Sequence, residues 1–221
     1  MKKQLFAGTA LVGVALLTSL GVWQVQRLAW KRELIERVEQ RVNAPPAPAP
    51  RPQDFDPARD EYRRVMLRGR FLNDRETLVQ AATKLGGGFW VMTPLQTDAG
   101  FTVLINRGFI PTSSRESRDW ARADGEVALG GLLRLTEPGG GFLRENQPEA
   151  DRWYSRDVAQ IGAARGVELA PYFVDADEQK EQFPIGGLTV VAFSDNHLQY
   201  ALTWFALALM LAYGGFRILR S

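Results

Sequence analysis

The chain contains no cysteine and a single histidine, His197, among its 221 residues. Without cysteine it can form no disulfide, no thiolate nucleophile and no thiolate site for copper or an iron–sulfur cluster. A lone histidine also excludes the zinc sites that are built from several histidines. Copper delivery is therefore disfavoured, and the stability of any folded domain must come from burial.

A strong charge of either sign is missing as well. The 27 basic residues nearly balance the 25 acidic ones, which is not the pattern of a nucleic-acid-binding protein. The glycine triplets at 86–88 and 139–141 lack the Lys-Ser/Thr that follows a phosphate loop, so they are interpreted as turns. Asp175 and Asp177 are interpreted as solvated residues of a polar loop. These observations argue against an enzyme.

Long apolar runs are present at both ends. Residues 5–23 carry no charge and would extend about 28 Å as a helix, enough to cross a bilayer core. A cleaved signal peptide is the alternative, since Lys2 and Lys3 resemble its basic start. The run lacks a small-residue cleavage site, however, and passes into Trp23, Arg27 and Trp30, which is typical of an interfacial helix end. An uncleaved membrane anchor is favoured.

The second run covers residues 198–216 and is followed by Arg217 and Arg220. A buried helix of a soluble domain is the alternative, but 19 uncharged residues favour a second membrane span. The basic residues of the two tails predict that both termini face the cytoplasm and that the central part lies outside. Basic residues between 27 and 41 oppose this orientation, although glutamates are interspersed among them.

The central part predicts a β-rich α+β domain with one or two helices and a sheet that resembles a barrel. Residues 31–42 have a helical pattern that either extends the first span or lies on a surface. The proline-rich segment 43–57 is expected to be an extended spacer that joins no sheet. One helix is expected from an N-cap at Ser155 to a stop at Gly166. The expected strands are short and apolar, at 62–71, 77–82, 89–95, 101–107, 127–135, 172–175 and 188–194.

The predicted organisation therefore has four parts. Residues 1–30 form the first transmembrane helix, and residues 31–59 form the amphipathic helix and the proline-rich linker. The β-rich extracytoplasmic domain covers residues 60–195. Residues 196–221 form the second transmembrane helix.

The start of the second span carries the only candidate ligand group. His197, Tyr200 and Trp204 share one helical face near the outer interface. The imidazole could act as an axial haem ligand or hydrogen-bond a lipid or a partner helix. The alternative is an ordinary interfacial histidine within an aromatic belt.

Five sequence motifs occur between and within the two spans. They are GVWQVQRLAWK, EYRRVMLRGRF, GGGFWVMTPL, VLINRGFIP and NHLQYALTWF. In this order the chain resembles the Surfeit-locus family of cytochrome c oxidase assembly proteins, called Shy proteins in yeast. The short MKKQLF start lacks an Arg- and Ser-rich transit peptide, so a bacterial inner-membrane member with a periplasmic domain is expected.

The resemblance implies a non-enzymatic assembly factor, or chaperone, that binds haem a and helps to place it in subunit I of the oxidase. His197 matches the family histidine linked to haem a and would be the metal ligand. Trp23, Gln24 and Arg27 match the first-span motif and are expected at the same site, with Tyr200 and Trp204. Arg107 and Gly108 match the family's NRG motif, where Arg107 is expected to pair with a carboxylate and Gly108 to allow a turn.

Two other functions stay open at this point. The first is a scaffold without cofactor whose outer domain docks an oxidase subunit or haem a synthase. The second is a general envelope lipid or solute binder, which requires the resemblance to be accidental. The expected partners are thus oxidase subunit I, haem a synthase as a further possibility, and the lipid bilayer, but no nucleic acid.

Overall fold

The structure is a computed structural model that describes residues 2–118, 120, 122–139, 144–177, 184–188 and 196–220, with side chains from Gly8 onward. The chain divides into two compact units, one of residues 1–39 with 191–221 and the other of residues 40–190. We call them the helical unit and the β domain, and describe each by itself.

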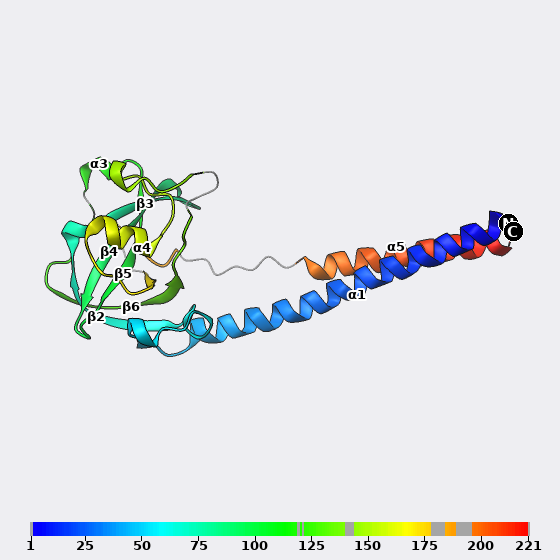
Figure 1. The fold of residues 1–221 in the computed structure, drawn as a ribbon, viewed down its shortest axis with the longest axis horizontal. Coiled ribbons are helices and arrows are strands. Elements are labelled where there is room, and N and C mark those ends of the chain that lie inside the picture. Colours follow the sequence, from blue (N-terminus) through cyan, green and yellow to red (C-terminus); the bar gives the residue numbers. More distant parts are fainter. Residues whose placement is uncertain are drawn as a thin grey trace. The chain divides into compact units, whose positions relative to one another are not determined.

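Two long helices make up the helical unit, α1 (Lys2–Asn43) and α5 (His197–Arg220). Both are long and apolar enough to cross a membrane. The two helices lie side by side (Figure 1). Helix α1 runs without a break through residues 31–42, so the amphipathic segment extends the first helix. The prediction of an apolar helix at each end is confirmed.

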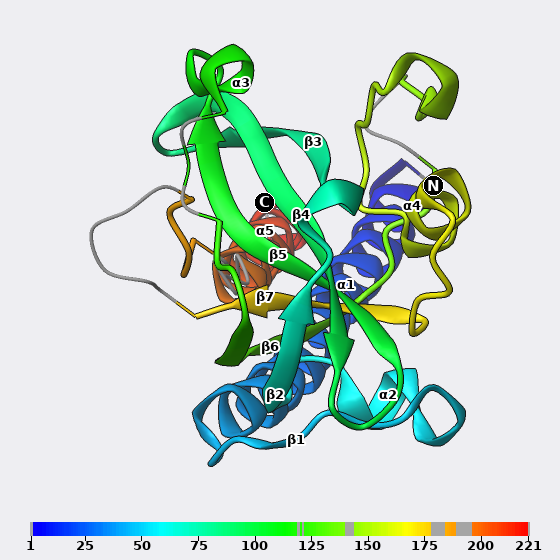
Figure 2. The same ribbon diagram turned by 90° about the vertical axis from the view of Figure 1, so that its left-hand side faces the viewer.

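The β domain is built on one seven-stranded sheet in the order β1-β2-β6-β7-β5-β4-β3. Its strands are β1 (Ala47–Pro48), β2 (Arg64–Phe71), β3 (Thr77–Thr83), β4 (Gly86–Thr97), β5 (Thr102–Pro111), β6 (Glu126–Leu135) and β7 (Tyr172–Ala176). An additional pairing joins β2 to the end of β4. This pairing closes the sheet on itself (Figure 2), because β4 pairs with β5 along most of its length and, on its other edge, with β3 at its start and β2 at its end.

Short helices connect the strands. They are α2 (Pro57–Asp60), α3 (Ser114–Ser117) and α4 (Val158–Arg165), with single 3₁₀ turns η1 (Pro52–Asp54), η2 (Asn73–Arg75) and η3 (Pro148–Ala150). Sheet and helices together confirm the α+β class. Six predicted strands are present with shifted ends, and the seventh, 188–194, lies almost wholly outside the described residues.

The core follows the strand period of two. Residues Val103 and Ile105 of β5 pack inside the closed sheet, whereas Leu104 between them packs outside. Helix α4 covers this outer face with Val158 and Ile161. Because both faces of β5 are covered, the strand is apolar along most of its length, as its sequence VLINRGFI shows.

Helix α4 begins later than predicted, because its N-cap is Asp157 and not Ser155. The Asp157 carboxylate accepts a hydrogen bond from the Gln160 amide at 3.1 Å. The negative charge of a carboxylate is also stabilised by the positive end of the helix dipole, whereas a neutral serine hydroxyl gains little from it. The predicted stop is confirmed, since Gly166 has a left-handed backbone.

The proline-rich segment is not a free spacer. Its residues Ala47 and Pro48 form β1, which pairs in parallel with β2. The Tyr172 hydroxyl donates a hydrogen bond to the Pro50 carbonyl at 2.5 Å, and the Phe55 ring packs on Tyr172. Proline cannot donate to a sheet but is accepted on an edge strand, where one side needs no donor. The segment therefore straps the edge of the β domain.

Candidate functional site

His197 occupies the first position of α5 and faces α1. Its Nδ1 lies 2.7 Å from Oε1 of Gln24 on α1. Gln24 is only 9% exposed, so this hydrogen bond is shielded at the contact between the two helices. The pair joins residues that are 173 positions apart in the chain. It is the candidate site of the helical unit.

Small residues bring the two helices close enough for this contact. A Cβ atom added to Gly21 would lie 2.5 Å from the Phe205 ring, one turn of α1 before Gln24. Ala201 and Ala208 are buried on the α5 side, and Ala10 meets Gly215 near the other end. Small side chains at such an interface let helix backbones approach closely in a membrane. The register of this packing places Gln24 opposite His197.

The donor chemistry of this pair fits a haem iron. Histidine is a common axial ligand of haem. Histidines that ligate metals usually hold their second ring nitrogen in a hydrogen bond, which fixes the ring orientation. Gln24 supplies that bond at Nδ1. The described residues contain no group of three or more acidic or histidine side chains that could hold a metal ion.

The other predicted site residues lie on the same two helices in different settings. Trp23 and Tyr200 are each 53% exposed, whereas Trp204 is partly buried. The Arg27 guanidinium stacks 4.0 Å above the Trp30 ring, one turn beyond Gln24. Of the three first-span residues, Gln24 is the one for which the structure shows a hydrogen bond to His197. The roles of all these residues in haem binding, His197 and Gln24 included, stay predictions.

The NRG motif forms part of the β domain. Arg107 lies 3.7 Å from the Glu76 carboxylate, and both side chains are more than 90% buried. Trp120 and Thr93 donate hydrogen bonds to the same carboxylate at 3.3 Å. Burial lowers the pKa of the Arg107 guanidinium. The predicted pairing of Arg107 with a carboxylate is confirmed.

The motif predicts a turn at Gly108, but the residue lies inside strand β5, where its φ is 129°. A side chain there would overlap the backbone of Ile185, which pairs with Phe109. Glycine is therefore needed for two reasons, the backbone conformation and the close approach of a second segment.

The interpretation of Asp175 as a solvated loop residue is wrong. It lies in β7 and is 4% exposed. Asn106 donates to its Oδ1 at 2.7 Å, and Arg134 and Arg156 each lie 3.2 Å from the carboxylate. Arg156 in turn binds Glu137 with two hydrogen bonds. Two arginines face two carboxylates, so the charges of this network balance. The network links β7 to β5 and β6.

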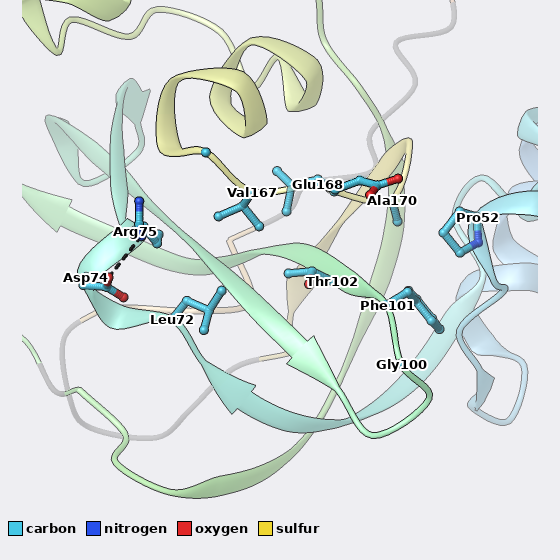
Figure 3. A pocket seen from close by; sticks show the side chains of 12 residues that line it. Pro52, Leu72, Asp74, Arg75, Gly100, Phe101, Thr102, Val167, Glu168 and Ala170 are labelled. Carbon is cyan, nitrogen blue, oxygen red and sulfur yellow. Dashed lines mark hydrogen bonds and ion pairs between the residues drawn. The ribbon is translucent and has the colours of Figure 1, made fainter.

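The β domain also has an open hollow of about 580 Å³ between η2, the start of β5 and the loop after α4 (Figure 3). Its cationic group is already engaged, because Arg75 donates to Asp74 at 3.0 Å and to the Arg165 carbonyl at 2.8 Å. Most of the remaining lining residues are apolar or glycine, and the side chain of Glu168 is exposed. We assign no chemistry to this hollow.

Comparison with known proteins gives the family. The chain is 38% identical to Surfeit locus protein 1 of Homo sapiens, over 90% of this chain and 72% of the human protein. It is 37% identical to the protein of the same name from Rattus norvegicus, over 90% and 70%. A SURF1-like protein of Monosiga brevicollis is 34% identical over 90% of this chain and 82% of that protein. The model of the SURF1 family matches residues 11–209, which include both helices and the β domain, and the chain belongs to this family.

Proposed function

We propose that this protein is a non-enzymatic assembly factor for haem-a-containing cytochrome c oxidase. It binds haem a through His197 and assists the transfer of haem a to subunit I. The observation that carries the proposal is the hydrogen bond between His197 on α5 and Gln24 on α1. It presents a restrained imidazole on a candidate membrane helix of a protein whose family is that of cytochrome c oxidase assembly factors.

The residues around His197 have separate roles in this proposal. Haem a, when bound, supplies an iron that accepts an axial nitrogen ligand. The rings of Trp23, Tyr200 and Trp204 offer apolar surface to a flat macrocycle. Arg27 offers a guanidinium that can pair with a carboxylate near the membrane interface. Stacking on Trp30 holds that guanidinium at the helix surface.

The proposed setting is a bacterial inner membrane. Helices α1 and α5 span it with both termini in the cytoplasm, and the β domain lies in the periplasm. Two apolar helices support the membrane setting. The proposed orientation rests on the basic residues in the two tails. Oxidase subunit I is the proposed partner, and haem a synthase is a second one.

The test is the absorption spectrum of the full chain purified from cells that make haem a. We expect the parent protein to carry haem a and the variant His197→Ala to lose most of it. Gln199→Ala is the matched control, since Gln199 is exposed on the same turn of α5. Equal haem a content and unchanged spectra in the parent and His197→Ala would refute the ligand role.

A scaffold without cofactor is the competing function, and a pull-down separates the two. A haem carrier should lose much of its association with subunit I in cells that cannot make haem a. A scaffold should keep its partner in the same cells. If the parent and His197→Ala both retain subunit I in cells that cannot make haem a, the scaffold is favoured.

A further inference from the structure

We infer that Gln24 is a positioning residue that selects which nitrogen of His197 binds iron. Its amide oxygen holds the proton of the imidazole on Nδ1, so that Nε2 carries the lone pair used for ligation. The inference deepens the proposed function and rests on it where iron is concerned. The tautomer itself can be measured without haem.

The geometry of the pair supports this assignment. The 2.7 Å separation between Nδ1 and Oε1 is that of a short, well-formed hydrogen bond. Gln24 is only 9% exposed, so water competes poorly for hydrogen bonds to its amide. The packing of Gly21 on Phe205 fixes the helices one turn away. Gln24 therefore has little freedom to leave the imidazole.

The chemistry of the two partners determines the tautomer. The amide oxygen of glutamine only accepts hydrogen bonds, so the nitrogen facing it must carry a proton. In a neutral imidazole the second nitrogen then has the free electron pair. A proton on Nε2 instead would block iron ligation at that atom.

The choice of an amide also matters for the charge of the ring. A carboxylate at the same place would favour the positively charged imidazolium, in which both nitrogens carry protons. The glutamine amide holds the Nδ1 proton without adding a negative charge. It thus orients the ring through a neutral partner. This is the outer-shell role that carboxylates or carbonyls have at many metal sites.

Because His197 is the only histidine in the chain, ¹⁵N-histidine labelling gives ring signals from this residue alone. We would record them on the haem-free full chain in detergent at about pH 8.5, well above the ordinary histidine pKa of about 6.5. We expect a protonated Nδ1 and an unprotonated Nε2 in the parent. Gln24→Leu should shift the population toward the Nε2-protonated tautomer.

Two further variants separate positioning from general damage. Gln24→Glu keeps an acceptor oxygen and should keep Nδ1 protonated. Gln26→Leu changes the same residue type at an exposed position of α1 and should leave the spectrum unchanged. An Nε2-protonated parent, or equal spectra for the parent and Gln24→Leu, would overturn the inference. The parent measurement alone decides this even if a variant fails to fold.

A haem titration links the tautomer to the proposed function. Gln24→Leu should bind haem a about 10- to 100-fold more weakly than the parent, the usual cost of losing an outer-shell partner, and Gln26→Leu should bind it equally well. A parent that shows the Nδ1-protonated tautomer but takes up no haem a would refute the proposed function and leave the positioning by Gln24 intact. Equal haem a affinity of the parent and Gln24→Leu would refute the iron-related part of the inference.

Discussion

Asp60 has no exposed surface and is surrounded by donors. Arg59 and Arg63 donate to its two oxygens at 2.7 and 2.6 Å, and the Asp56 amide donates at 2.9 Å. The hydrogen bond from Arg59 is the main reason that the pKa of the Asp60 carboxyl lies well below its usual range. Asp60 thus stabilises the short helix α2, which connects the proline-rich segment to β2.

The depressed pKa of Asp60 predicts a pH-dependent contribution to stability. A carboxyl with a lower pKa in the folded state stabilises the fold above its ordinary pKa of about 4. That stability is lost as the pH falls toward the folded-state pKa. Asp60→Asn should therefore cost about 1–3 kcal/mol at neutral pH, and the cost should decrease progressively as the pH falls below about 4.

Urea unfolding of the full chain at several pH values would measure this dependence. Asp74→Asn is the control, because the Asp74 side chain is 73% exposed and should matter by less than about 0.5 kcal/mol. A cost of Asp60→Asn that stays constant between neutral and acidic pH would contradict the assignment.

Asp175 shows why single residues are hard to interpret from sequence. An aspartate near the end of a short strand has the same local signature whether it is solvated or buried. Its partners Asn106, Arg134 and Arg156 come from three separate places in the chain. The pairing of β7 with both β5 and β6 brings Asp175 beside Asn106 and Arg134, and the segment before α4 adds Arg156.

At the scale of elements, the contact between α1 and α5 sets the geometry of the candidate site. Gly21 leaves room for the Phe205 ring, whereas nothing lies within 4 Å of a Cβ at Gly8 on the same helix. A bulky side chain at Gly21 must displace the ring or separate the helices. Either change moves Gln24 relative to His197.

Gly21→Leu is therefore expected to act like the loss of Gln24. The histidine ring signals should move toward those of Gln24→Leu, and haem a affinity should fall about 10-fold. Gly8→Leu should change neither measurement. If Gly21→Leu leaves the ring signals and the haem a affinity as in the parent, close packing at this point does not control the site.

At the scale of the whole molecule, the proposed topology can be tested with single cysteines, since the chain has none of its own. Lys84→Cys places a thiol at an exposed position of the β3–β4 hairpin, and Ser221→Cys places one at the C-terminus. A maleimide that does not cross membranes should label Lys84→Cys on intact spheroplasts. It should label Ser221→Cys only after the membrane is permeabilised.

The reverse labelling pattern would invert the orientation. Labelling of both thiols on intact spheroplasts would rule out a cytoplasmic C-terminus. The parent protein serves as the blank in each experiment, because any signal from it must come from other proteins in the preparation.

The sequence alone determined the two apolar helices, the β-rich class and most strands. These features depend on local periodicity, which can be seen in short windows of residues. It also singled out His197, because a lone histidine at the start of an apolar helix stands out without any structure.

Only the tertiary structure decided the features that depend on distant partners. These are the closure of the sheet through β2 and β4, the strap formed by Ala47 and Pro48, the burial of Asp175, and the pairing of Gln24 with His197. The physical reason is the same for each. A hydrogen bond or ion pair between remote segments depends on how two surfaces pack, and neither segment carries the other's position in its own sequence.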